Sequence, residues 1–293
     1  MPASGVPQGR VLVLGSANLD LVATTIRHPA PGETLIGRSY SEHPGGKGLN
    51  QAVAAARAGA RTRFIGAIGR DDAGRTLATV AGDSGVDTSG LITVDEPTGR
   101  ALILVADSGE NSIVVVPGAN QSCPPAPVEQ GEVVLSQLEV PLDVVTTTFR
   151  QARAIGAVTI LNPAPAAELP AEMLQTVDIL IPNEHELELL GGVDQLLASG
   201  VGTVVVTLGA AGARLHTGDL VVALPSPSVD AIDTTGAGDT FCGYLAAGLA
   251  AGLDVESSAR RGCVAGALTT TRPGAVPSIP VAAEVDGLIA GGS

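Results

Sequence analysis

Residues 11–15 read VLVLG, an apolar run that ends in a glycine. Short apolar runs of this kind recur along the chain and alternate with alanine-rich stretches of helical length. A strand that is apolar throughout is typical of a sheet covered by helices on both faces. The alternation therefore predicts an α/β fold with a mostly parallel sheet. The expected strands are 11–15, 63–69, 157–162, 178–183 and 203–209, and the expected helices include 47–60, 141–155, 238–252 and 254–271.

Two segments break this alternation. Residues 17–44 contain strand-like pieces separated by prolines and glycines, and residues 98–117 predict a hairpin with its turn at 108–111. Neither segment has an adjacent helix to cover it, so we expect the two to form a small antiparallel sheet standing off the main body. Such a sheet could be a lid over a site or a dimer contact, and an ordinary edge hairpin fits the pattern equally.

Composition limits the class of protein. The chain has 293 residues, of which 45% are hydrophobic and 16% charged, so it can fold around a sizeable core. Its net charge of -14 argues against a nucleic acid or an acidic membrane surface as a partner. The sequence has no apolar run of membrane-spanning length and no signal-like start, and its three distant cysteines fit a reducing cytosol. We therefore expect a cytoplasmic protein.

Residues 233–241, DTTGAGDTF, connect a strand-like piece to the helix expected at 238–252. A loop of small residues that enters a helix directs several backbone N–H groups at one point, where the helix dipole attracts anions. The stretch lacks the third glycine of a dinucleotide-binding fingerprint and the spacing of a Walker loop. Taken alone, it could also be a glycine-rich turn with a capping aspartate.

Asp239 changes this interpretation, because a carboxylate at the mouth of an anion-binding loop would repel a bound phosphate. It has a use there if it accepts the proton of a hydroxyl group that attacks the phosphate. Phosphoryl transfer passes through a loose transition state, in which positioning and charge stabilisation dominate. The motif therefore predicts a kinase that phosphorylates a hydroxyl group.

With DTTGAGDTF and an earlier glycine-rich stretch, PGGKGLNQA at 44–52, in one chain, the sequence resembles the ribokinase family of sugar kinases, the pfkB-type carbohydrate kinases. The resemblance extends over nearly the whole chain, from VLVLGSANLD to TRPGAVPSIP. It implies a ribokinase-like three-layer α/β/α fold with a mostly parallel central sheet and a small antiparallel β-sheet lid. The catalytic domain would comprise residues 1–16, 45–97 and 118–293, and the lid or dimerisation subdomain residues 17–44 and 98–117.

The resemblance also implies a sugar site. Asn18 and Asp20 would bind hydroxyl groups, with Asp20 accepting from both members of a vicinal diol, although Asn-x-Asp after a strand can also be a turn or a cap. Glu139 would reach the sugar from the end of a strand, and a solvated carboxylate is the alternative. The implied substrate-binding residues are Asn18, Asp20, Gly45, Gly46, Lys47, Asn50, Glu139 and Asp239.

For the phosphoryl donor, the resemblance implies that Asp239 is the catalytic base and that Gly236, Ala237 and Gly238 supply the anion hole. Asn183 and Glu186 match the family's N-x-x-E motif, which acts through water on Mg²⁺ and the phosphates. Glu186 could instead simply belong to the first turn of a helix. The implied ATP-binding residues are Asn183, Thr207, Leu208, Gly209, Ala210, Ala211, Gly212, Gly238 and Asp239.

A potassium ion is implied as well, beside the anion-hole loop, where it would brace the loop's carbonyl groups. All of its implied ligands are oxygen atoms, which suit a hard cation. They are the Asp233 carboxylate, the Ser278 hydroxyl and the backbone carbonyls of Thr235, Thr269, Arg272 and Gly274.

The sequence departs from the family pattern in places. The interval 183–207 is short, so we expect its helix to be reduced to 193–199. Cys263 occupies a position where family members can carry a histidine that packs against the adenine base of ATP. Leu49 stands where the glycine motif usually has alanine, and could pack beneath the loop.

Lys47 is the only lysine; the other fifteen basic residues are arginines. It opens the helix expected at 47–60, near the place where the resemblance brings donor and acceptor together. A flexible ammonium group there could follow the phosphoryl group as it moves, which a bulkier guanidinium would do less well. A lone surface lysine without a function is the alternative.

Together these features imply ATP-dependent phosphorylation of D-ribose at its 5-hydroxyl group, with Mg²⁺ accompanying ATP and K⁺ as an activating ion. A homodimer formed through the lid is also implied. Within the family, a kinase for deoxyribose, fructose or a nucleoside is the alternative. Outside it, a non-catalytic sugar- or nucleotide-sensing relative remains, although such a binder has no use for a base at Asp239.

Overall fold

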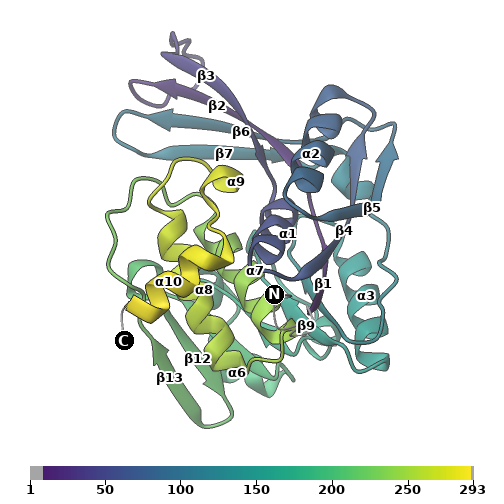
Figure 1. The fold of residues 1–293 in the computed structure, drawn as a ribbon. Helices are drawn as coiled ribbons and strands as arrows, with labels where there is room; N and C mark the ends of the chain where they lie inside the picture. The colour runs from purple at the N-terminus through teal and green to yellow at the C-terminus, as the bar shows by residue number, and fades with distance from the viewer. Residues whose placement is uncertain (1–8, 292–293) are drawn as a thin grey trace, which may run out of the picture.

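The computed structural model describes residues 9–291; residues 1–8 and 292–293, which fall in the expected catalytic domain, lie outside the described residues. The described chain forms three layers, with helices on both faces of a large sheet, and a smaller sheet extends from one end (Figure 1). No helix in this part of the chain is both long and apolar enough to cross a lipid bilayer.

The large sheet is mostly parallel, as expected. Its strands from β5 to β11 are parallel, and only β12 and β13 at one edge are antiparallel to their neighbours. The order is β13-β12-β11-β10-β9-β8-β1-β4-β5. The strands are β1 (Arg10–Leu14), β4 (Arg61–Gly69), β5 (Asp87–Val94), β8 (Glu132–Ser136), β9 (Val158–Leu161), β10 (Ile179–Leu180), β11 (Thr203–Thr207), β12 (Ala213–Thr217) and β13 (Leu220–Leu224).

The helices divide between two hydrophobic cores, one on each face of the sheet. The first core includes residues of α1 (Lys47–Arg57), α2 (Asp72–Asp83), α7 (Ala237–Ala250), α8 (Val255–Thr269), α9 (Ala275–Ser278) and α10 (Ala282–Gly291). The second includes residues of α3 (Leu142–Ala154), α4 (Ala171–Leu174) and α6 (Val193–Ala198), with α5 (Glu184–Leu189) packed against it. Two short 3₁₀ turns, η1 (Gly118–Ser122) and η2 (Gly209–Ala211), complete the described elements.

The β1 strand shows how the apolar run VLVL builds both cores. Successive side chains of a strand point to opposite faces of the sheet. Val11 and Val13 accordingly pack into the core that contains α1 and α7, and Leu12 and Leu14 into the core that contains α3. All four side chains are fully buried. The continuous apolar run is therefore the consequence of a central strand that is covered twice.

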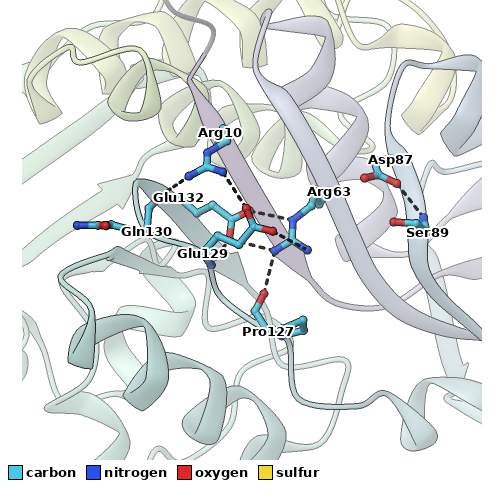
Figure 2. A network of polar contacts seen from close by, with 8 residues as sticks. All are labelled: Arg10, Arg63, Asp87, Ser89, Pro127, Glu129, Gln130 and Glu132. Carbon is cyan, nitrogen blue, oxygen red and sulfur yellow. Dashed lines mark hydrogen bonds and ion pairs between the residues drawn. The ribbon is translucent and has the colours of Figure 1, made fainter.

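A network of polar contacts joins the amino ends of β1, β4 and β8 (Figure 2). Arg63 of β4 donates from Nε and Nη2 to the two carboxylate oxygens of Glu132 on β8, at 2.8 and 3.0 Å. Glu132 is buried, so this bidentate pair fixes the two strands on either side of β1. Arg10 of β1 pairs with Glu129 at 2.8 Å. The opposite, carboxyl ends of these strands carry the candidate site.

The small sheet consists of β2 (Asn18–Thr25), β3 (Ser39–Gly45), β6 (Gly99–Ala106) and β7 (Asn111–Val116), in the order β3-β2-β6-β7. The hairpin expected at 98–117 is present as β6–β7, and the strand-like pieces of 17–44 form a second hairpin, β2–β3. The sheet is nevertheless mixed rather than antiparallel, because β2 and β6 are parallel. Each of them leaves the main body at its first residue, Asn18 or Gly99, and these two residues are paired. Because the first strand of each hairpin leaves the body in the same direction and beside the other, these two strands pair in parallel.

Most other expected elements are confirmed with small changes at their ends. The expected helix 193–199 is α6, and the helices expected at 141–155, 238–252 and 254–271 are α3, α7 and α8. The strand expected at 178–183 is reduced to the two residues of β10, with Asn183 forming an isolated bridge to Thr207. Four strands of the large sheet were not among those expected from the sequence: β5, β8, β12 and β13.

Candidate active site

Several of the expected site residues lie at or just after the carboxyl ends of four strands of the large sheet: β1, β8, β10 and β11. Such ends are where ligands bind in open α/β sheets. A cavity of about 230 Å³ opens there, and a larger one of about 720 Å³ lies next to it. The two share Asn183, Thr207, Thr234 and Gly238 in their walls. The smaller cavity is also lined by Lys47, Asn162, Ala164, Ile181, Glu186, Gly236, Asp239 and Cys242.

The two glycines before Lys47 are required by close approach and by backbone conformation. A Cβ atom on Gly45 would lie 2.2 Å from Oδ2 of Asp20, so the glycine leaves room for that carboxylate. Gly46 has φ of 92°, in the region that favours glycine, and a Cβ there would lie 2.6 Å from the backbone N of Asn18. The α1 helix can therefore begin at Lys47 directly against the turn that follows β1.

The Asp239 carboxylate is held by two amides of α1. Asn50 donates from Nδ2 to Oδ2 of Asp239 at 2.9 Å, and Gln51 donates from Nε2 to Oδ1 at 3.0 Å. All three side chains are buried. The resemblance implied a sugar contact for Asn50, whereas the structure directs its amide nitrogen to Asp239. Its Oδ1 is buried without a partner among the described residues, which leaves an acceptor for a substrate hydroxyl.

Glu139 is enclosed by donors. Its Oε2 accepts hydrogen bonds from the Ser16 hydroxyl at 2.5 Å, the Asn18 amide at 3.3 Å and the backbone N–H of Lys47 at 3.1 Å. This carboxylate therefore joins the β1 turn to the first residue of α1. The alternative of a solvated carboxylate does not describe it, because its donors come from the site.

Asn18 has a supporting contact that the sequence did not indicate. Its Oδ1 accepts from Nδ2 of Asn120 at 2.7 Å, and Asn120 in turn accepts from the backbone N–H of Ala17 at 2.9 Å. Its own Nδ2 donates one hydrogen to Glu139, which leaves the second N–H of the amide for another acceptor. It positions Glu139 and the start of β2 in this state.

Asp20 and Lys47 carry the main electrostatic features of the site. Burial raises the pKa of Asp20 to about 7, and the nearby carboxylates of Glu139 and Asp239 add to the shift. The Asp239 carboxylate raises the pKa of Lys47 against the effect of its burial, and Glu139 and Glu186 act in the same direction as Asp239. The ammonium group is thus a positive charge among a group of carboxylates.

The loop expected to form the anion hole leads directly into α7. Gly236 adopts the left-handed conformation with φ of 76° and precedes α7, whose first turn contains Asp239. Gly236 and Gly238 line the smaller cavity, and a Cβ on Gly238 would meet only open space. The backbone N–H of Ala237 instead bends back to the carbonyl of Thr234 at 3.3 Å. The free helix N-terminal donors that remain for an anion are then those around Gly238.

Asn183 and Glu186 form a capping box at the start of α5. Oδ1 of Asn183 accepts from the backbone N–H of Glu186 at 2.8 Å, and Oε2 of Glu186 accepts from the backbone N–H of Asn183 at 2.9 Å. Burial raises the pKa of Glu186. Both side chains still line the smaller cavity, so the motif combines a helix cap with a carboxylate facing the site.

The larger cavity receives most of the expected ATP-binding residues. Thr207, Gly209, Ala210 and Gly212 line it together with Asn183 and Gly238, whereas Leu208, Ala211 and Asp239 do not. Cys263, which stands where family members can carry a histidine, lines this cavity too. Much of the remaining wall comes from the loop 226–231 and from small residues of α8, which carry no motif of their own: Ser226, Pro227, Ser228, Val229, Ala231, Gly262, Gly266, Ala267 and Thr270.

The residues implied for a cation lie close to the anion-hole loop. Oδ1 of Asp233 accepts from the backbone N–H of Thr235 at 2.9 Å, and its Oδ2 accepts from the backbone N–H of Gly274 at 2.8 Å. Asp233 therefore joins the loop before α7 to the loop after α8. Ser278 is fully buried, and its hydroxyl donates to the carbonyl of Ala275 at 2.7 Å, which leaves its lone pairs free.

Leu49, which departs from the alanine usual in the family's glycine motif, is buried in the core.

Chemically, this arrangement can place an anion at a helix N-terminus between a held carboxylate and a buried ammonium group. The larger cavity can take a nucleotide-sized molecule, and a second molecule with hydroxyl groups can meet Asp20, Glu139 and Asp239. The geometry fits transfer of a phosphoryl group from the first molecule to the second.

Comparisons with known proteins agree with this geometry. Residues 8–282 match the family described as pfkB family carbohydrate kinase. The chain is 41% identical to a ribokinase of Haemophilus influenzae over 93% of its own length and 95% of that protein. It is 38% identical to a ribokinase of Staphylococcus aureus, covering 94% of this chain and 98% of that one. The solved structure of the Arabidopsis thaliana ribokinase complexed with ribose and ATP superposes with a TM-score of 0.88 at 32% identity, covering 97% and 99% of the two chains.

Proposed function

The chain belongs to the pfkB family of carbohydrate kinases, and we propose on this basis that it transfers the γ-phosphoryl group of ATP to the 5-hydroxyl group of D-ribose. One observation carries the proposal beyond family membership. The Asp239 carboxylate lies in the wall of the smaller cavity, while Asp20 and Glu139 are close enough to influence one another electrostatically. A hydroxyl group bound between these carboxylates has its proton acceptor and its phosphoryl donor on either side.

In this proposal each residue has one task. Asp20 and Glu139 accept hydrogen bonds from ribose hydroxyl groups, and the free Oδ1 of Asn50 accepts another. The O5 atom forms a bond to the γ-phosphorus as the bond from that phosphorus to the bridging oxygen of ADP breaks. The hydroxyl proton passes to Asp239. Lys47 and the N–H groups around Gly238 stabilise the negative charge on the transferring group.

Mg²⁺ is part of the proposal because the donor is ATP, and it neutralises charge on the phosphates when bound. Glu186 and Asn183 would hold its water ligands. Their position in the wall of the smaller cavity, which Asp239 and Lys47 also line, supports this role. Glu186 is buried, which raises the pKa of its carboxyl group, and a nearby cation would offset that cost.

A potassium site is also proposed, with the Asp233 carboxylate, the Ser278 hydroxyl and carbonyls of Thr235, Thr269, Arg272 and Gly274 as ligands. The donor set fits a hard cation, since every atom is an oxygen. Among residues 9–291 no three His, Cys, Asp or Glu side chains gather as a metal site, so such an ion would depend on backbone carbonyls. Asp233 already joins the two loops that would enclose it.

We expect turnover to be faster in potassium than in sodium buffer at equal ionic strength, by about tenfold, because a braced loop positions the anion-hole N–H groups. Initial rates in the two buffers measure this, with Asp233→Asn as the variant that should lose the difference. Equal rates in the two buffers would remove the ion from the proposal.

The dependence of kcat/KM on pH should reveal the titration of the Asp20 carboxyl group. Its pKa of about 7 means that the carboxylate is mostly protonated at pH 6 and ionised at pH 8. Only the ionised form accepts hydrogen bonds from both hydroxyl groups of a diol, so kcat/KM for ribose should rise with pH. At pH 6 we expect about one tenth of the plateau value reached above pH 8. Asp20→Asn should lower the plateau and remove the step, whereas a flat wild-type profile from pH 6 to 8 would contradict the assignment.

The small sheet is proposed as a lid, comprising residues 17–44 and 98–117, with residues 1–16, 45–97 and 118–293 as the catalytic domain. Cross-strand pairs share a face of a sheet, and Asp20 pairs with Ala101, which pairs with Val115. The face carrying these residues is therefore the one turned to the site. The lid would exclude water that could otherwise accept the phosphoryl group.

The opposite face of the lid is apolar and exposed, and we propose that it forms a homodimer. It carries Leu102 and Val114, which are paired with each other and 46% and 60% exposed, together with Tyr40 and Val116. Apolar patches of this kind mark interaction surfaces. In light scattering during size exclusion, we expect the wild type at twice the mass of the chain and Leu102→Glu/Val114→Glu at the monomer mass. A monomeric wild type at micromolar concentration would contradict the dimer.

Three buried, unpaired cysteines are compatible with a reducing compartment, and the proposal includes a cytoplasmic location.

The substrate is tested by ADP release with ribose, deoxyribose, fructose and adenosine. We expect the highest kcat/KM with ribose. A higher value with another acceptor would move the enzyme to a different substrate of the same family, and no turnover with any acceptor would support a non-catalytic relative.

A further inference from the structure

Two fully buried glutamines, Gln51 and Gln137, have no task in the mechanism described so far. Gln51 follows Asn50 in α1, and Gln137 directly follows β8. A buried amide is costly unless its donors and acceptors are satisfied, so their contacts should have a reason.

The direction of the Gln51 amide is fixed by its partners. Nε2 donates to Oδ1 of Asp239 at 3.0 Å and to Oδ1 of Asn162 at 3.2 Å. An ionised carboxylate can only accept, so the NH₂ group must face Asp239. The Gln51 carbonyl then needs a donor of its own, and Nε2 of Gln137 supplies it at 2.6 Å.

The contacts beyond Gln51 keep the same direction. Asn162 donates from Nδ2 to the carbonyl of Ile181 at 3.0 Å, and a backbone carbonyl cannot donate in return. Its Oδ1 must therefore face Gln51. On the other side, a Cβ on Gly15 would lie 2.1 Å from Oε1 of Gln137, so the glycine at the end of β1 makes room for this side chain. Reversing the Gln51 amide would put its carbonyl against the Asp239 carboxylate and, with Gln137 as it stands, donor against donor. Oε1 of Gln137 has no hydrogen-bond partner among the described residues.

The result is a two-point hold on the base. Asn50 holds one oxygen of Asp239 and Gln51 holds the other. The last torsion of an aspartate side chain is soft, so without both donors the carboxylate plane could rotate. The lone pair that must meet the substrate proton would then be misdirected.

We propose that Gln51, oriented by Gln137, is a positioning residue that sets the direction of the Asp239 carboxylate. This rests on the proposed phosphoryl transfer to a hydroxyl group. Gln137 touches neither Asp239 nor either substrate site, so it acts only through Gln51.

The test compares Gln51→Met, Gln137→Met and the double variant in the full chain, with kcat, both KM values and the melting temperature measured for each. A misdirected catalytic group can lower the rate about 100-fold, so we expect a fall of that order in kcat for Gln51→Met, with both KM values within about threefold of wild type. Gln137→Met should lower kcat about tenfold. The double variant should equal Gln51→Met, because a residue that acts through another adds nothing once that one is gone.

Thr148→Val is the matched control, since Thr148 is fully buried in α3 and its hydroxyl accepts from the backbone N–H of Ala126 far from the site. It should lower the melting temperature and leave kcat unchanged. If Gln51→Met does not fold, the kcat of Gln137→Met alone tests the positioning role. An unchanged kcat in Gln137→Met, or effects that multiply in the double variant, would overturn the proposal. Failure of the proposed function is distinct, because wild-type protein would then be inactive as well.

Discussion

Asp239→Asn should lower kcat for ribose phosphorylation about 10³-fold and leave the KM values for ATP and ribose within a few-fold of wild type. The change replaces a proton acceptor by an amide of the same shape, so it removes a contribution made mainly in the transition state. Steady-state rates with both substrates varied measure this split. Retention of more than a tenth of wild-type kcat would contradict the assignment of the base.

The variant also has a structural consequence. Both oxygens of Asp239 accept from amide donors, and an asparagine must present its own NH₂ group to Asn50 or to Gln51. The Asn50 amide can reverse to accept from it, because Oδ1 of Asn50 has no other partner among the described residues. The stability should therefore fall by less than about 1–3 kcal/mol, the cost of a buried donor left facing another. Rates are therefore compared below the melting temperature of the variant. Asp254→Asn is the matched control, because Asp254 caps the next helix by accepting from the backbone N–H of Ser257 at 2.7 Å, and asparagine can do the same.

Lys47→Met should lower kcat/KM by about 10²–10³-fold, the cost of removing one charged donor from a preorganised anion site. Lys47 is the only lysine of the chain, and Asp239, Glu139 and Glu186 all favour its charged form. Removing the ammonium group leaves these carboxylates facing the incoming phosphates with no compensating charge. The loss should appear in kcat and in KM for ATP.

Lys47→Arg separates the charge from its shape. The cavity in front of Lys47 is about 230 Å³, and a planar guanidinium would occupy more of it while keeping the charge. We expect turnover between wild type and Lys47→Met, with the loss in kcat rather than in ribose binding. Wild-type turnover in Lys47→Met would mean that the lysine is present by chance.

The layered fold could be predicted from the sequence because its signal is local. The run VLVL reports burial on both faces of β1 without any knowledge of its neighbours. The parallel pairing of β2 and β6 could not be predicted in this way, because it depends on where two distant hairpins leave the body. β10 was overestimated because the apolar run continues past the two residues that pair.

The same distinction between local and long-range signals applies to the site residues. Asp239, Gly236 and Lys47 stand in glycine-rich motifs, whose backbone geometry restricts the residues that fit. Gln51 stood inside a quoted motif and still had no assigned role, because its partner Gln137 is 86 residues away. Asn120 was missed for the same reason, since its bond to Asn18 spans 102 residues. Contacts between amides far apart in sequence leave no periodic pattern.

The central claim is phosphoryl transfer from ATP to the 5-hydroxyl group of ribose, and the phosphorus NMR spectrum of the product tests it most directly. Purified protein is incubated with ribose and MgATP, with the Asp239→Asn protein run in parallel. The account predicts one new phosphomonoester whose phosphorus is coupled to the two protons of a methylene group, formed in the same amount as ADP and about 10³-fold more slowly by the variant. A phosphorus coupled to a single ring proton, or ADP formed without any new phosphoester, would contradict it.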